Sequence, residues 1–136
     1  MLICGCSGLF DPDPDDYEDN LEKWNSSGIE DYSFRSTRQC FCFGVAPVIV
    51  RVDADTIVSV TDAATGDPVD PQFLDIYLTI DGIFAVIRDA IEQDVFELSV
   101  AYHETLGYPT RVDIDYQENT IDDEITYFAS ELVELP

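Results

Sequence analysis

Two cysteines separated by a single residue, Cys40 and Cys42, are the side chains in this sequence best suited to chemistry. Thiolates bind soft metal ions such as Cu(I) or zinc, whereas an oxidising compartment would join the pair as a disulfide. In a flat strand residues i and i+2 lie about 6.6 Å apart with parallel side chains. A disulfide needs Cβ atoms about 3.8 Å apart. We therefore expect a disulfide if the chain bends here, with free thiols or a metal site as the alternatives.

The acidic segment from residue 113 to 124 is the second candidate site. The ligand positions of an EF-hand calcium loop would fall on Asp113, Asp115, Gln117, Asn119 and Glu124. The central turn of that loop requires a glycine, and this chain has Glu118 there, between strand-like flanks. The pattern argues against an EF-hand and leaves a solvated acidic turn or a looser calcium site. The candidate ligands of the calcium site are Asp115, Asp122, Asp123 and Glu124.

His103, the only histidine, could act as a general base in a hydrolase, because imidazole exchanges protons near neutral pH. No motif ties it to a serine, a cysteine or a second carboxylate, and the sequence has no phosphate-binding glycine loop. The alternation of its strand places it on the solvent face, near Glu104 and Arg111. We therefore expect an ordinary surface histidine, whose loss costs under about 0.5 kcal/mol, and a protein that is not an enzyme and carries no cofactor.

A predicted hairpin between residues 94 and 124 positions these side chains. Two runs alternate between apolar and polar residues, which predicts two antiparallel strands with one face on a core. The apolar face would carry Phe96, Leu98, Val100, Tyr102, Val112, Ile114 and Tyr116. The turn contains Gly107, Tyr108 and Pro109. We expect a positive φ at Gly107, and we expect Tyr108 to project from the turn toward a partner.

The rest of the chain supplies two helices and four further strands. Tyr17, Leu21 and Trp24 recur at helical spacing, and Thr79 can cap a second helix with an apolar stripe from Ile80 onward. The predicted helices cover 15–27 and the stretch after residue 79, and the other strands cover 31–43, 47–52, 56–61 and 124–135. The fold class is therefore α+β, an antiparallel sheet of about six strands with two helices on one face, in the order α-β-β-β-α-β-β-β.

The charge of the chain limits the classes of partner. The 136 residues include 29 Asp and Glu against six Lys and Arg, a formal net charge of -23. That field repels nucleic acid and anionic lipid surfaces, whose binding relies on Lys and Arg. With 46% hydrophobic residues the chain is no disordered acidic tail. Solubility in high salt, as in halophilic proteins, explains an acidic surface, and recognition of a basic partner is the alternative.

The first residues predict a location. Ile3-Cys4-Gly5-Cys6 resembles the bacterial lipobox, in which a small residue precedes the cysteine that is lipidated, so Cys6 is the predicted lipidation site. The basic start and apolar region of a signal peptide are missing. We expect residues 1–14 to be a truncated signal end with an acidic tether, and 15–136 to be one domain. The alternative is an ordinary N-terminus with two chance cysteines.

Several blocks together resemble the domain of unknown function 6174 family of bacterial envelope lipoproteins. They are Tyr32-Ser33-Phe34, Cys40-Phe41-Cys42, Pro47-Val48, Thr79 to Phe84, Tyr102 to Pro109, Ile114-Asp115-Tyr116 and Asp122-Asp123-Glu124. The resemblance covers most of residues 15–133, and the turn before Ile114 and the acids after it are its most specific part. It implies a secreted, lipid-anchored α+β domain and supplies no catalytic residues.

These observations favour a non-catalytic, lipid-anchored domain of the cell envelope that faces the periplasm or the exterior. Its partner would be a protein, a peptide or an envelope polymer, met on the outer face of the sheet or at a loop end. It would meet the membrane through the lipid alone and would not bind nucleic acid. A calcium-binding module using residues 113–124 is the alternative, and a hydrolase using His103 comes third.

Overall fold

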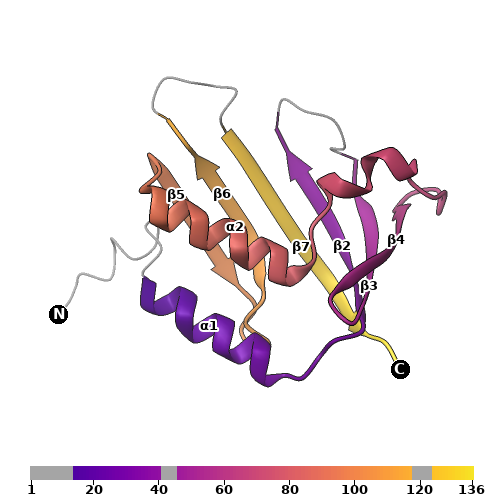
Figure 1. Ribbon diagram of the computed structural model, residues 1–136, viewed down its shortest axis with the longest axis horizontal. Coiled ribbons are helices and arrows are strands. Elements are labelled where there is room, and N and C mark those ends of the chain that lie inside the picture. Colours follow the sequence, from indigo (N-terminus) through magenta and orange to yellow (C-terminus); the bar gives the residue numbers. More distant parts are fainter. Residues whose placement is uncertain (1–13, 41–45, 118–123) are drawn as a thin grey trace.

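The computed structural model describes residues 14–40, 46–117 and 124–136. Six strands form one antiparallel sheet in the order β4-β3-β2-β7-β6-β5, and helices α1 and α2 lie on one face of it (Figure 1). The elements are α1 (Pro14–Ser26), β2 (Tyr32–Gln39), β3 (Val48–Asp53), β4 (Thr56–Asp62), η2 (Pro71–Ile76), α2 (Ile80–Gln93), β5 (Glu97–Tyr102), β6 (Pro109–Asp115) and β7 (Glu124–Glu134). This confirms the predicted α+β class and order of elements, to which η2 adds a short 3-10 helix.

Helix α2 is fixed at both ends by its own sequence. The Thr79 side chain accepts a hydrogen bond from the Gly82 N–H at 2.9 Å and caps the first turn, as predicted. Asp94 ends the helix in the left-handed conformation with φ of 53°. Between these caps, residues at helical spacing are buried against the sheet: Ile80, Ile83, Phe84, Ile87 and Ala90. The apolar stripe therefore sets which side of α2 faces the core.

The core lies between the helices and the inner face of the sheet. Every strand contributes buried residues to it, including Phe34, Val50, Val60, Val112 and Ile114. Trp24 of α1, 3% exposed, packs edge-on against the rings of Tyr32 and Tyr108 and donates a hydrogen bond to Asp81 of α2 at 3.0 Å. Trp24 therefore anchors α1 to the core. Burial of aromatic rings of this size is a large contribution to stability.

The two edges of the sheet differ. The segment after β4 folds back over that strand, with a bridge between Thr61 and Pro68 and a hydrogen bond from the Val69 N–H to the Val60 carbonyl at 2.9 Å. β5 is the last strand at the other edge, and no strand in the described part of the chain pairs with its outer side. No described helix covers the outer face of the sheet (Figure 1).

Two details of the sheet differ from the prediction. Phe96 was expected on the core face, yet its side chain is 46% exposed, because it precedes β5 at the margin of the sheet. No helix was predicted between the strand at 56–61 and the helix after residue 79, but Asp70 accepts a hydrogen bond from the Gln72 N–H and begins η2. Within the described residues, no helix is long and apolar enough to cross a membrane.

Candidate functional site

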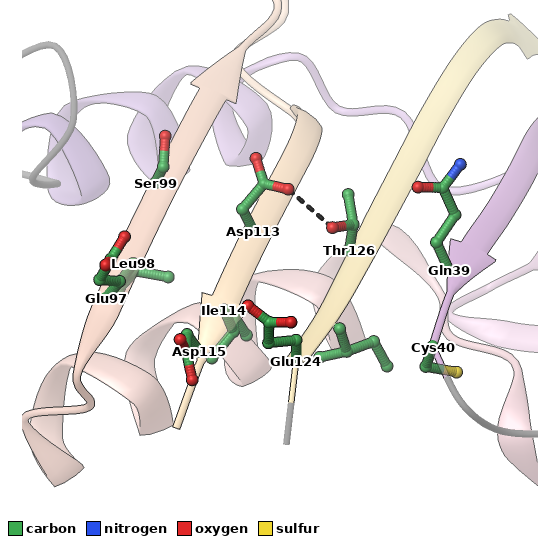
Figure 2. A pocket seen from close by; sticks show the side chains of 11 residues that line it. Gln39, Cys40, Glu97, Leu98, Ser99, Asp113, Ile114, Asp115, Glu124 and Thr126 are labelled. Carbon is green, nitrogen blue, oxygen red and sulfur yellow. Dashed lines mark hydrogen bonds between the residues drawn. The ribbon is translucent and has the colours of Figure 1, made fainter. Parts of the chain in front are cut away.

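A groove of about 610 Å³ lies on the outer face of the sheet, where β5 and β7 begin and β6 and β2 end. Figure 2 shows its side chains with the helices behind the sheet. The lining residues are Gln39, Cys40, Glu97, Leu98, Ser99, Asp113, Ile114, Asp115, Glu124, Ile125 and Thr126. None of the described residues that line it is basic, and four of them are acidic. The groove is therefore an acidic surface built by four strands.

Strand register places the groove side chains in two rows that run across the sheet. One row joins Ser99, Asp113, Thr126 and Gln39, each opposite the next on the neighbouring strand. We call the other the acidic row: it consists of Glu97 on β5, Asp115 on β6 and Glu124 on β7. Residues directly opposite each other on antiparallel strands have Cβ atoms about 4.5–5.5 Å apart. The register thus brings together acids that are far apart in the sequence.

The first row is electrostatically balanced. Asp113 accepts hydrogen bonds from Arg111 Nε at 2.8 Å and from Thr126 Oγ1 at 2.7 Å. Burial raises the pKa of Asp113, but the hydrogen bonds from Arg111 and Thr126 outweigh it and hold that pKa below its usual value. The Arg111 guanidinium also lies 5.2 Å from the centre of the Phe128 ring. Asp113 is therefore satisfied within the protein.

Within the described residues, the acidic row has no partners comparable to those of Asp113. Glu97 and Glu124 are exposed, and the Oδ1 atom of Asp115 is buried without a hydrogen-bond partner in the described part of the chain. Like charges directly opposite each other on neighbouring strands destabilise a sheet. A buried carboxylate oxygen that lacks a partner adds a further cost of desolvation. A positively charged group in the groove would relieve the repulsion between these carboxylates.

The predicted metal ligands are only partly described. Asp115 and Glu124 are direct cross-strand neighbours, while Asp122 and Asp123 lie outside the described residues. Within residues 14–40, 46–117 and 124–136, no group of three or more His, Cys, Asp or Glu is arranged to hold a metal ion. Cys40, half-buried directly after β2, lines the groove, and Cys42 also lies outside the described residues. The calcium site stays a prediction.

The turn between β5 and β6 confirms one prediction and overturns another. Gly107 has φ of +83°, as expected. Tyr108 does not project toward a partner: it is 4% exposed and packs against Trp24 and His103. Pro109 is buried as well. The turn folds against α1, where the Lys23 side chain donates to the Glu104 carbonyl at 3.4 Å, so the ring of Tyr108 is enclosed.

His103 is a structural residue of the same turn. Its Nδ1 accepts hydrogen bonds from the N–H groups of Leu106 at 3.0 Å and Thr105 at 3.3 Å, and its ring stacks on Tyr108 with centroids 4.8 Å apart. The prediction of an ordinary surface histidine is wrong, because the chain curls back over the ring. With Nδ1 acting as acceptor, the neutral ring carries its proton at Nε2. His103 therefore holds the turn through its Nδ1.

A second acidic grouping, missed by the sequence reasoning, lies where the β3–β4 turn approaches α2. Burial, followed by a hydrogen bond with Asp55, raises the pKa of Asp81, which also accepts from Trp24 Nε1. At the exposed side of this turn a hydrogen bond between Asp31 and Asp53 lowers the pKa of Asp31 and raises that of Asp53. The sequence signal was the Asp53-Ala54-Asp55 turn, but nothing local linked it to Asp81.

Comparisons with known proteins bear on the family and not on a ligand. A family model described as "Family of unknown function (DUF6174)" matches residues 16–134. No curated protein and no solved structure matches the chain. The matched range includes every strand of the sheet and nearly all of α1, together with the groove and the turn at Gly107. The chain therefore belongs to the DUF6174 family, a family of unknown function.

Proposed function

We propose that this chain is a non-catalytic binding domain of the cell envelope whose outer groove takes a positively charged segment of a partner protein or peptide. The observation that carries the proposal is the acidic row of Glu97, Asp115 and Glu124 in a groove whose described lining has no basic residue. A cationic segment would neutralise the opposed carboxylates of this row.

The polar row beside it would help to orient such a segment. Ser99, Thr126 and Gln39 offer hydroxyl and amide groups along one line of the groove. Arg111 is engaged with Asp113 and Phe128 and therefore leaves the acidic row unopposed. Arranged charges of this kind steer a partner and fix its register more than they add raw affinity.

A hydrolase centred on His103 has little support, since its Nδ1 is occupied by two backbone N–H groups. Calcium binding by residues 113–124 is the second candidate. The observation in its favour is that Asp115, whose Oδ1 has no hydrogen-bond partner among the described residues, lies directly across from Glu124. Carboxylate oxygens suit a hard cation, but a calcium site would need ligands beyond these two.

The proposed location is the cell envelope, with a lipid on Cys6 and a disulfide between Cys40 and Cys42. Support for the disulfide is that Cys40 is not a free thiol and lies where the described strand ends. Mass spectrometry of the mature protein tests both modifications. An unmodified Met1, or two thiols at Cys40 and Cys42 that react with alkylating agents before reduction, would contradict them.

The function is tested by calorimetric titration of the full chain with pentalysine and, separately, with calcium chloride. The groove variant combines Glu97→Gln, Asp115→Asn and Glu124→Gln. The matched control combines Glu18→Gln, Asp19→Asn and Glu22→Gln in α1, on the helical side of the sheet, and removes the same number of charges. The buffer contains about 0.15 M salt, where the Debye length is about 8 Å.

We expect pentalysine to bind the wild-type chain and to lose at least about tenfold in affinity, or about 1.4 kcal/mol, with the groove variant. The α1 control should bind nearly as well as the wild type. Equal losses in both variants would mean that pentalysine responds only to the overall charge of -23, and the proposal would fall. Calcium binding that disappears with Asp115→Asn alone would favour the second candidate instead.

A further inference from the structure

No described strand pairs with the outer edge of β5, and this edge suggests how the partner is held. We propose that a basic segment of a partner protein binds in extended form along β5 and adds a seventh strand to the sheet. This inference rests on the proposed function of the groove and specifies its mode of recognition. Strand addition of this kind obtains affinity from main-chain hydrogen bonds and specificity from alternate side chains.

β5 has few of the features that protect sheet edges. Edge strands are usually shielded by lysine, proline, bulges or a covering segment. β4 at the opposite edge is covered by the segment around Pro68 and Val69. The sequence of β5, ELSVAY, contains no lysine or proline, and its one register shift lies at the far end, between Ala101 and Tyr102. Within the described residues, the outer edge of β5 is open to pairing.

The charge at this edge identifies the partner. The acidic row runs from Glu124 through Asp115 and ends at Glu97 on β5 itself, so the next position in that row belongs to an added strand. A lysine or arginine there would lie directly opposite Glu97 and extend the row with the opposite charge. Opposite charges that face each other across strands stabilise pairing. The residue of the added strand two positions further along would lie opposite Ser99, on the same face of the sheet.

The inner face of the sheet at this edge determines which residues fit at the alternate positions of the added strand. Leu98 is buried and Val100 half-buried, so residues of an added strand opposite them would face the margin of the core. Phe96, 46% exposed just before β5, offers a further apolar contact at the same end. The segment that fits is therefore one in which basic and apolar residues alternate. A second copy of this chain fits poorly, because each copy carries a net charge of -23.

The test uses a blocked hexapeptide, Lys-Val-Lys-Val-Lys-Val, titrated against the full chain. An added strand directs only every second backbone N–H toward β5. Two further peptides of the same sequence carry N-methyl groups on the odd or on the even residues. Charge and composition are the same in both, so they serve as matched controls for each other. Hydrogen exchange of the β5 amides is followed with and without the unmodified peptide.

We expect the unmodified peptide to bind, one N-methylated form to bind at least tenfold more weakly than the other, and every second amide of β5 to gain protection. Strand addition would be overturned if the two N-methylated forms bound with equal affinity and the exchange of the β5 amides did not change. If binding were still lost in the groove variant of Glu97, Asp115 and Glu124, the proposal of an acidic binding groove would remain. No binding of any lysine peptide would overturn both proposals. A dimer of the free chain with protected β5 amides would assign the edge to a second copy and overturn the inference.

Discussion

Replacement of Gly107 by alanine tests how the β5–β6 turn is joined to α1. At φ of +83°, an alanine pays the cost of a left-handed conformation, about 1–2 kcal/mol. The added Cβ would also lie 2.7 Å from Lys23 Cβ and would come closer still to the Asn20 carbonyl oxygen, both in α1. A backbone oxygen cannot rotate away as a side chain can, so the helix or the turn must move. Overpacking of this kind costs about 1–3 kcal/mol.

The expected loss for Gly107→Ala is therefore about 2–5 kcal/mol of unfolding free energy. Gly66→Ala is the matched control, because Gly66 has φ of +79° and open space where its Cβ would lie. It should cost only the conformational strain, about 1–2 kcal/mol. The difference between the two variants isolates the packing of the turn against α1.

The assay is urea unfolding at fixed high salt, followed by the fluorescence of Trp24, the only tryptophan. Trp24 suits this purpose because it lies in the core and contacts Tyr108 in the turn. Equal losses for Gly107→Ala and Gly66→Ala would refute the close approach of the turn to α1. A lower slope with urea for Gly107→Ala alone would mean that α1 has detached before global unfolding.

Three further predictions concern stability. His103→Ala should cost about 1–3 kcal/mol in urea unfolding, because two turn N–H groups lose their acceptor and Tyr108 loses its stacked ring; the exposed neighbour Glu104→Ala should stay within about 0.5 kcal/mol, and a reversed order would show that the ring does not hold the turn. Asp81→Asn should raise the melting temperature near pH 7. The raised pKa of Asp81 means that the folded state favours the neutral carboxyl, so the wild type loses stability as pH rises through that pKa. The gain in melting temperature from Asp81→Asn should therefore vanish toward about pH 3, where the wild-type carboxyl is neutral as well. A gain that persists at that pH would contradict the raised pKa of Asp81. The melting temperature of the wild-type chain should rise from low salt to molar KCl, where the Debye length falls to about 3 Å and the repulsion within a net charge of -23 is screened; a flat or falling curve would argue against adaptation to high salt.

Local sequence patterns were sufficient to predict the helices and strands and to predict which face of each one is buried. The alternation around Leu98 and Val112 and the helical spacing from Ile80 gave the correct burial, because each pattern reports on one element against one core. Caps are equally local, and the roles of Thr79 and Gly107 could be predicted for that reason. The predicted burial of Phe96 was wrong, because the sequence alternation continues beyond the end of the strand whereas the core does not.

The composition of the candidate site could not be predicted in the same way. Alternation placed Glu97, Asp115 and Asp113 on the outer face, but it did not say which of them lie opposite Glu124 or Thr126. Cross-strand neighbours depend on register between β5, β6 and β7, which is fixed by contacts between residues distant in sequence. The acidic row and the groove therefore emerged only from the assembled sheet.

The sequence alone thus determined the class of fold, the two faces of each element and the excess of acidic residues, because these depend on composition and on short periodicities. The tertiary structure decided that Tyr108 is buried, that His103 supports a turn and that no described strand pairs with the outer edge of β5. These outcomes depend on how a turn folds back on α1 and on which strand ends the sheet. Both are set by packing between distant segments, for which a linear pattern carries no signal.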